Sequence, residues 1–169
     1  MTTPQPAGAT EGRKGAELQA ELEAMSSNFH ALLTEIPAEE LRRPSFGTRW
    51  TNGELLAHAV ASLELVPREI ACARSGKGLY NYPSWFLAPV NYLMIKRSAR
   101  GATTESLGRR FDVALDRARV VLDGVRDDEW RKGANFWGEG FRDIEGLFKI
   151  IPEHFAEHSS QVLRAIGRG

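Results

Sequence analysis

Apolar residues recur every three or four positions through most of the chain, a spacing that is typical of amphipathic helices. The first such stripe begins at Ala16 and ends just before Pro37. A second begins at the segment 51–54 (TNGE), where a threonine followed three residues later by glutamate forms a capping-box pattern, and extends to about Arg74. Pro67 lies inside this second helix and is expected to kink it, because it removes one backbone donor.

The second half of the chain predicts two more long helices. One is expected between Thr103 and Gly124, where apolar residues again keep the helical spacing. The last ends near Ile166 and begins at either Asp143 or Ile151; with the later start, Pro152 would occupy its first turn.

Between the second and third stripes lies a segment rich in aromatic residues, residues 80–92. Pro83 suits the start of a helix there, and Pro89 predicts either a kink or a break. Its aromatic side chains could line a substrate pocket, although we expect most of them to belong to the core or to a dimer face.

The chain has no convincing period-two alternation and no repeat at the period of a solenoid. These patterns together predict an all-α protein, a helix bundle with two long connections. Residues 1–15 lack an apolar stripe and are rich in Thr, Pro, Gly and Ala, so we expect a disordered N-terminal tail followed by one helical domain over residues 16–169.

Composition narrows the possible functions. Lys plus Arg equals Asp plus Glu at 22 each, so no net field favours a nucleic acid or an acidic membrane. No run approaches the length of a membrane span, and the first dozen residues do not resemble a signal peptide. The single cysteine, Cys72, can form no internal disulfide and is expected to be a buried thiol. We therefore expect a cytoplasmic protein whose partner is a small molecule rather than nucleic acid or membrane.

Three of the four histidines suggest a metal site. His154 and His158 are four residues apart, which places both imidazoles on one helical face, one turn apart. His58 lies on the apolar flank of the second helix and is the natural third ligand. Imidazole nitrogens suit several divalent first-row ions, including zinc, nickel and iron. The alternative is that these histidines are ordinary hydrogen-bonded residues of the helices, which is the usual role of an isolated histidine or HxxxH pair.

Two segments carry a family resemblance. Residues 50–58 (WTNGELLAH) resemble the helix start W-[ST]-x-x-E-L-x-x-H of the DinB/YfiT-like superfamily, and residues 154–161 (HFAEHSSQ) resemble its C-terminal HxxxHxxQ helix. The similarity spans roughly residues 16–166. It implies a four-helix bundle with a long crossover connection, commonly dimeric. It also implies a metal ion on His58, His154 and His158 with one position left open.

The resemblance implies a metal-dependent enzyme, either a transferase that uses a low-molecular-weight thiol or a hydrolase. The superfamily includes mycothiol-dependent maleylpyruvate isomerases, but the C-terminal extension of those enzymes is not present in this sequence. The short thiol transferases therefore fit its length better. The alternative function is a non-catalytic, dimeric stress-response protein with a structural metal. Only three good ligands are visible, whereas a structural zinc normally has four, and this count favours chemistry.

Several other residues have two possible roles. Glu54 could orient His58 or act as a base, but closing the capping box is its simpler role. Gln161 could hydrogen-bond into the site or connect helices, and His30 could reach the site or stay at its edge. Glu153 and Glu157 are expected to be solvated. A group of arginines could bind the carboxylates of a substrate or thiol, although a solvated helix end is the simpler interpretation; these are Arg97, Arg100, Arg109 and Arg110.

Overall fold

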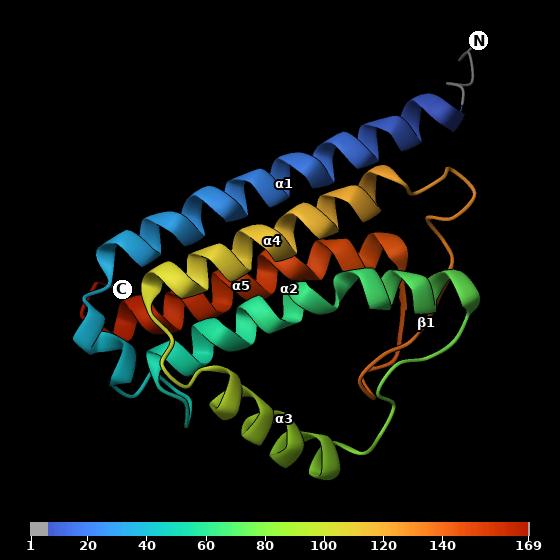
Figure 1. The fold of residues 1–169 in the computed structure, drawn as a ribbon. Coiled ribbons are helices and arrows are strands. Elements are labelled where there is room, and N and C mark those ends of the chain that lie inside the picture. The colour runs from blue at the N-terminus through green and yellow to red at the C-terminus, as the bar shows by residue number, and fades with distance from the viewer. Residues whose placement is uncertain (1–6, 169) are drawn as a thin grey trace.

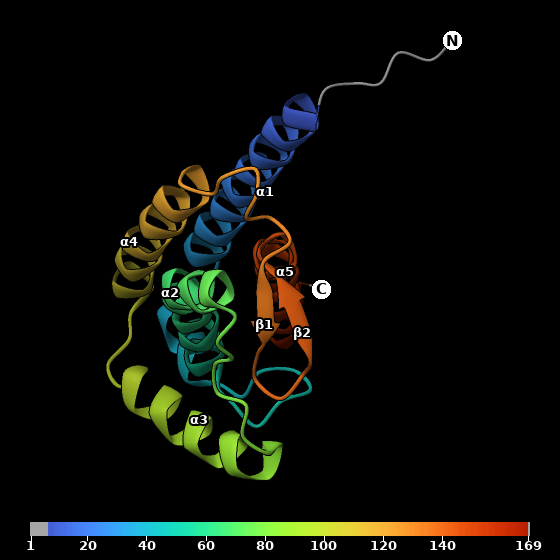
Figure 2. The same cartoon turned by 90° about the vertical axis from the view of Figure 1, so that its right-hand side faces the viewer.

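The computed structural model describes residues 7–168, and within them four long helices form the bundle that the sequence predicts. These helices are α1 (Ala7–Glu35), α2 (Asn52–Ser75), α4 (Thr104–Asp123) and α5 (Ile144–Ala165). Helices α1 and α2 each pack against both α4 and α5, so the four helices surround a common core. A fifth helix, α3 (Ser84–Ser98), packs against α2 and stands out from the bundle (Figures 1 and 2).

Two of the helix boundaries differ from the prediction. Helix α1 begins at Ala7 rather than Ala16, because the last proline of the N-terminal segment is Pro6 and no proline follows until Pro37. Residues 1–6 of the predicted tail lie outside the described residues. At the other end, α5 takes the earlier of its two expected starts, since the Asp143 side chain accepts a hydrogen bond from the Gly146 amide and caps the helix.

Prolines inside helices do not end them. Pro152 lies well inside α5 and not in its first turn, and Pro89 lies inside α3, which continues to Ser98. Pro67 lies inside α2, as predicted. Each proline removes one donor from its helix, but the packing of the surrounding turns is sufficient to keep the helix continuous.

A small hairpin precedes α5 and was not expected from the sequence. It pairs β1 (Gly133–Asn135) with β2 (Phe141–Asp143) in antiparallel register. Three-residue strands are too short for a period-two pattern to be visible. The turn between them is possible because Gly138 and Gly140 adopt positive φ angles.

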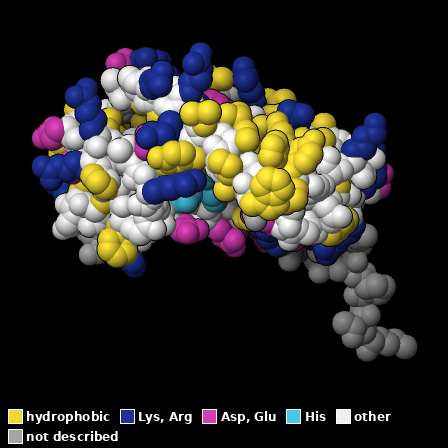
Figure 3. Space-filling model, turned by 90° about the horizontal axis from the view of Figure 1, so that it is seen from below, with side chains coloured by type: hydrophobic (Ala, Val, Ile, Leu, Met, Phe, Trp, Pro, Cys, Tyr) yellow, Lys and Arg dark blue, Asp and Glu magenta, His cyan; other side chains and the backbone are white. Residues whose placement is uncertain are grey.

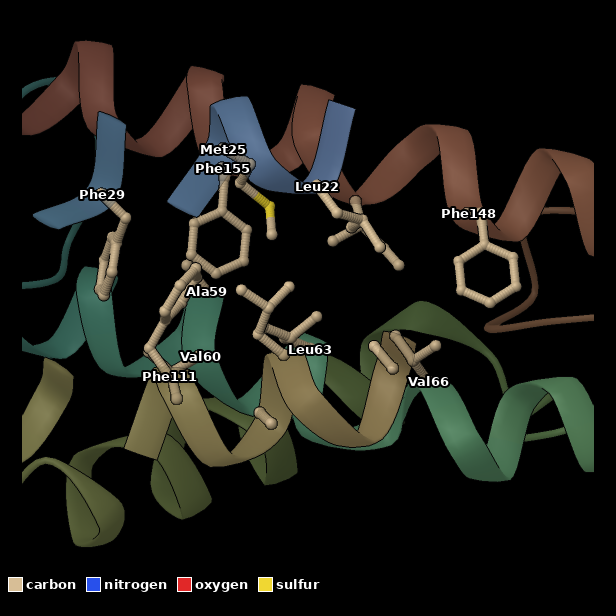
Figure 4. Packing of buried hydrophobic residues seen from close by; sticks show 14 of the residues in the cluster. Leu22, Met25, Phe29, Ala59, Val60, Leu63, Val66, Phe111, Phe148 and Phe155 are labelled. Atoms are coloured by element: carbon tan, nitrogen blue, oxygen red, sulfur yellow. The ribbon is translucent and has the colours of Figure 1, made fainter. Parts of the chain in front are cut away.

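The centre of the core is a group of three phenylalanines from three helices. The ring of Phe29 on α1 stacks on Phe111 of α4, with 4.4 Å between centroids, and meets Phe155 of α5 edge-on at 5.4 Å. All three are almost fully buried, and aliphatic side chains of α1 and α2 fill the space along the bundle axis (Figure 4). This packing fixes the rotation of α5 about its own axis. His154, which precedes Phe155, and His158, one turn later, thereby occupy the side of α5 that faces α2.

The connection from α1 to α2 is held by backbone contacts. It contains the short 3-10 helix η1 (Ala38–Arg42) and then turns back, with the Ser45 amide donating to the Trp50 carbonyl and the Asn52 amide to the Arg43 carbonyl. The capping box between Thr51 and Glu54 then starts α2. These contacts place Trp50 immediately before the helix that carries His58.

Candidate metal centre

His58, His154 and His158 meet between α2 and α5. One ring nitrogen from each lies within 4.8 Å of the other two. The Nε2 atoms of His58 and His154 are 3.2 Å apart, and the ring centroids of the two α5 histidines are 4.3 Å apart. A tetrahedral ion with metal–nitrogen bonds of about 2.0–2.1 Å separates its ligand nitrogens by about 3.3 Å. The first pair of nitrogens therefore has the spacing of two metal ligands, and the complete set could hold a metal ion.

The tautomer of His158 is fixed by its neighbour Gln161. Nδ1 of His158 lies 2.8 Å from Oε1 of Gln161, and an amide oxygen only accepts, so Nδ1 carries the proton and donates. In this tautomer the lone pair of Nε2 is free. This Nε2 atom is buried and has no hydrogen-bond partner among the described residues. A buried acceptor without a partner is costly, and a metal ion would satisfy it.

His58 and His154 are kept neutral by burial. Burial lowers the pKa of His58 to about 3, with a further contribution from His154 and then His158. Burial also lowers the pKa of His154 to about 4, assisted by His158. Neutral imidazole is the form that binds metal, so the site holds these two rings ready for an ion at physiological pH.

Two further side chains contact the cluster. The ring of Trp50 lies 4.7 Å from that of His58, and its buried Nε1 has no hydrogen-bond partner within the described part of the chain. Ser62, one turn after His58, donates to the His58 carbonyl, and its Oγ lies 3.4 Å from Nε2 of His154. Sequence reasoning identified neither residue as part of the site. Trp50 was noted only as part of the helix-start motif. For Ser62, the one indication in the sequence is its position one helical turn after His58.

Glu54 closes the capping box, as its simpler interpretation predicted. One of its carboxylate oxygens accepts from the Thr51 amide at 3.0 Å, and its own amide donates to the Thr51 hydroxyl. The other oxygen lies 3.8 Å from Nζ of Lys96 on α3. Glu54 is thus one turn from His58 but engaged at the helix start, and its predicted catalytic role stays a prediction.

Two cations lie over one aromatic ring beside the cluster. Tyr92 of α3 is parallel to Trp50, with 6.4 Å between ring centroids. The Arg49 guanidinium lies 4.1 Å from the Tyr92 centroid, and Nζ of Lys96 lies 5.1 Å from it. The pKa of Lys96 is raised by a hydrogen bond with Tyr92 and then by Glu54, so Lys96 remains protonated. We call Arg49, Trp50, Tyr92 and Lys96 the rim of the site.

The site reaches the molecular surface on the face shown in Figure 3. Histidine side chains are visible there between basic, acidic and hydrophobic side chains. His58 and His154 are partly exposed, whereas His158 is buried. A small molecule can therefore approach the cluster from this side.

Other candidates lie away from the histidines. His30 is exposed on α1, and its Nε2 lies 2.7 Å from Asp112 of α4, so it does not belong to the cluster. Cys72 is fourteen residues beyond His58 on α2, a rise of about 21 Å. Glu153 and Glu157 are exposed, as expected. Of the arginines, Arg109 pairs with Glu105, and Arg110 pairs with Glu64.

The aromatic segment divides between two places. Tyr92 belongs to the rim, whereas Tyr80 stacks on Trp137, 4.6 Å away and outside the cluster. Trp85 and Phe86 face outward on α3, with 75% and 46% of their surface exposed. Trp85 and Phe86 therefore do not belong to the core, and the alternative, a dimer face, stays a prediction.

The protein is an all-helical bundle in which histidines from α2 and α5 meet. Comparison with models of protein families identifies the family to which it belongs. The model of the DinB superfamily matches residues 21–162, and the chain belongs to this superfamily. No curated protein matches the chain. The matched range includes all three histidines of the cluster.

Solved structures share the fold at low sequence identity. A mycothiol-dependent maleylpyruvate isomerase superposes with a TM-score of 0.71 and 15% identity, covering 96% of this chain and 63% of that protein. A mutant of such an isomerase gives a TM-score of 0.70 at 14% identity, with the same coverage. A protein from Streptococcus pneumoniae gives 0.68 and 15%, covering 89% of this chain and 88% of its own. This chain thus spans less than two thirds of the isomerase.

Within residues 7–168, no helix combines the length and the apolar character that a bilayer span requires.

Proposed function

We propose that His58, His154 and His158 bind one divalent transition-metal ion and that the loaded site is catalytic. The observation that carries the proposal is the buried Nε2 of His158, which has no hydrogen-bond partner among the described residues and whose lone pair is free because Nδ1–H donates to Gln161. The donor set is made of neutral nitrogens, which suits zinc, nickel or iron better than magnesium or calcium. Three protein ligands leave a coordination position for a substrate.

The reaction that we propose is transfer to or from a low-molecular-weight thiol. When bound, the ion would supply Lewis acidity that lowers the pKa of a thiol toward neutrality. The fold shared with a mycothiol-dependent enzyme supports a thiol as the second reactant. Such thiols are kept reduced in the cytoplasm, which is the location we propose and which also suits a single cysteine.

The residues of this chain have separate tasks in that reaction. Gln161 holds the His158 ring in one tautomer, and the buried surroundings of His58 and His154 keep both rings unprotonated. Trp50 covers one side of His58 and limits the approach of water there.

Metal content tests the first half of the proposal. Protein purified without a histidine tag should contain about one ion per chain by elemental analysis, and His58→Ala and His154→Ala should each lose it. His30→Ala is the matched control, because that histidine is paired with Asp112 outside the cluster and should leave the metal content unchanged. Equal metal content in all four proteins would reject the site.

Thiol binding tests the second half. Calorimetry with mycothiol, bacillithiol and glutathione should give binding to the loaded protein and none to the metal-free protein. Water activation, and hence a hydrolase, would be favoured if metal were bound but no thiol were. A fourth protein ligand seen in the loaded structure would instead indicate a structural metal and a non-catalytic protein.

We also propose that the protein is a homodimer, with a second copy covering the outward face of α3. This face exposes Phe86, Val90 and Leu93 by 46%, 42% and 69%, at the spacing that places them on one side of the helix, and a larger apolar patch of this kind is uncommon on a monomer. The hydrophobic area in Figure 3 lies beside the histidines. A dimer formed there would border the site.

A further inference from the structure

Arg49 and Lys96 are two cations beside the histidine cluster, and among the described ion pairs they have one carboxylate partner, that of Glu54. No described carboxylate forms an ion pair with Arg49. Lys96 forms an ion pair with Glu54 at 3.8 Å, so one carboxylate faces two cations and a net positive charge remains. The sequence has no Asp or Glu between Glu69 and Glu105, so α3 itself carries no acidic side chain.

Two stacked rings lie between the two cations and the histidine cluster. Both cations lie over the ring of Tyr92, the ring of Trp50 lies parallel to that of Tyr92, and Trp50 contacts His58. A ligand with one end at the histidines could therefore extend over the Trp50 and Tyr92 rings and place its other end between the two positive groups. Its middle would lie on apolar ring surface, and its end would meet charge.

We propose that Arg49 and Lys96 form an anion subsite that binds a carboxylate of the substrate or thiol whose other end occupies the histidine centre. This inference rests on the proposed function, since it concerns what that centre accepts. The guanidinium and ammonium groups come from different elements, the loop before α2 and the last turn of α3. Both point to the same ring, so a carboxylate there would meet two charge-assisted donors.

The structure changes which cations fill this role. From the sequence, the candidates were Arg97, Arg100, Arg109 and Arg110. The ion pairs of Arg109 with Glu105 and of Arg110 with Glu64 neutralise two of them on the bundle surface. Arg49 and Lys96, which the sequence did not distinguish from other surface cations, lie beside the site instead.

The test uses two thiols with six-carbon chains, mercaptohexanoate, which ends in a charged carboxylate, and mercaptohexanol, which ends in a neutral hydroxyl. Protein loaded with Co²⁺ reports the binding of each through its visible absorption, which changes when a thiolate approaches the ion. At constant ionic strength, mercaptohexanoate should bind about tenfold more tightly than mercaptohexanol. Equal affinity of the two thiols in the wild-type protein would overturn the subsite.

Variants assign the preference to the proposed residues. Lys96→Met and Arg49→Met should each reduce it several-fold, and the double variant should abolish it while still binding mercaptohexanol. Lys96→Arg should retain it, because the charge is kept. Arg109→Met is the matched control for lost positive charge and should leave the preference unchanged, since Arg109 pairs with Glu105. A preference that survives the double variant would contradict the proposal.

A second pair of ligands separates this inference from the proposed thiol chemistry. If neither thiol changes the Co²⁺ spectrum, thiol activation is rejected, and the subsite is then tested by calorimetry with adipate and its monoamide, which both keep one carboxylate for the ion. Adipate should bind the loaded protein in preference to the monoamide, and the Arg49→Met, Lys96→Met double variant should lose that preference. No preference in either pair of ligands rejects the subsite independently of the thiol reaction.

Discussion

Nδ1 of His158 donates a hydrogen bond to Oε1 of Gln161, three residues later on the same helix, across 2.8 Å. This contact determines which nitrogen of the buried ring is free. A histidine that binds metal usually donates its other N–H to such a partner, which fixes the tautomer and the orientation of the ring. The contact therefore connects a side chain outside the histidine cluster to the proposed metal affinity.

Replacing Gln161 by methionine should weaken metal binding without unfolding the protein. The substitution removes the acceptor for Nδ1 and frees the ring to rotate or change tautomer, and losses of such partners typically cost about 10–100-fold in affinity. Competition against a chelator of known affinity measures the change. Gln19→Met is the control, since Gln19 bonds Asp123 at the far end of the bundle; if both variants matched the wild type, Gln161 would have no role in the site.

The metal-free protein should lose stability as the pH falls below about 6.5. The pKa values of His58 and His154 are about 3 and 4 in the folded state, below the ordinary value of 6.5, so the unfolded chain binds more protons over this range. Stability is therefore fully present above the unfolded pKa and is lost as the pH decreases toward the folded values. Urea unfolding at a series of pH values measures this dependence.

Glu145 provides an internal comparison for that experiment. Hydrogen bonds with Lys149 and then Lys14 lower its pKa to about 2, so its contribution is lost only below its ordinary value of 4.5. A His58→Phe, His154→Phe variant should lack the decrease between pH 6.5 and 5 but keep the decrease at lower pH. Parallel curves for the variant and the wild type above pH 5 would show that the histidines are not buried as described.

Phe111→Ala should destabilise the protein by about 3–5 kcal/mol. Its ring is fully buried against Phe29 and Phe155, and truncation leaves a cavity that the surrounding helices fill only in part. Chemical denaturation measures the change. Val113→Ala, two residues along and half exposed, should cost less than about 0.5 kcal/mol. Similar values for the two variants would mean that the core is not packed around Phe111.

Two substitutions of Glu54 separate its capping role from a catalytic one. Glu54→Gln keeps an oxygen that can accept from the Thr51 amide and should retain nearly all stability, whereas Glu54→Ala should lose about 0.5–2 kcal/mol with the cap. Thermal and chemical unfolding give both values. A glutamine variant that is stable but has lost thiol transfer would establish the catalytic role instead.

Leu93→Glu should convert the proposed dimer to a monomer. Leu93 is 69% exposed on the outward face of α3, and a charge there would be buried without a partner if a second copy covered it. Light scattering coupled to size exclusion measures the mass. Val120→Glu changes a residue of α4 that is 72% exposed, and it should leave the mass unchanged. A wild-type protein that is already monomeric at micromolar concentration would contradict the dimer.

The local features of the fold and of α5 were predictable from the sequence. Helical spacing and caps depend on neighbours within a few residues, so the extents of α2 and α4 and the cap of Thr51 by Glu54 agree with the prediction. The same holds for His154 and His158, which any helix places one turn apart. The start of α1 and the small hairpin were not predictable, because neither residues 7–15 nor the short strands carry an apolar period.

The sequence by itself determined which residues form helices and which histidines share a face, because hydrogen bonds and side-chain spacing within one helix are set by nearby residues. Only the tertiary structure decided that His58 meets the two histidines of α5, that His30 does not, and that Arg49 and Lys96 lie over Tyr92 beside them. Those relationships depend on how α2, α3 and α5 are rotated and packed. That packing is fixed by contacts such as Phe29 with Phe111 and Phe155, between residues far apart in the chain.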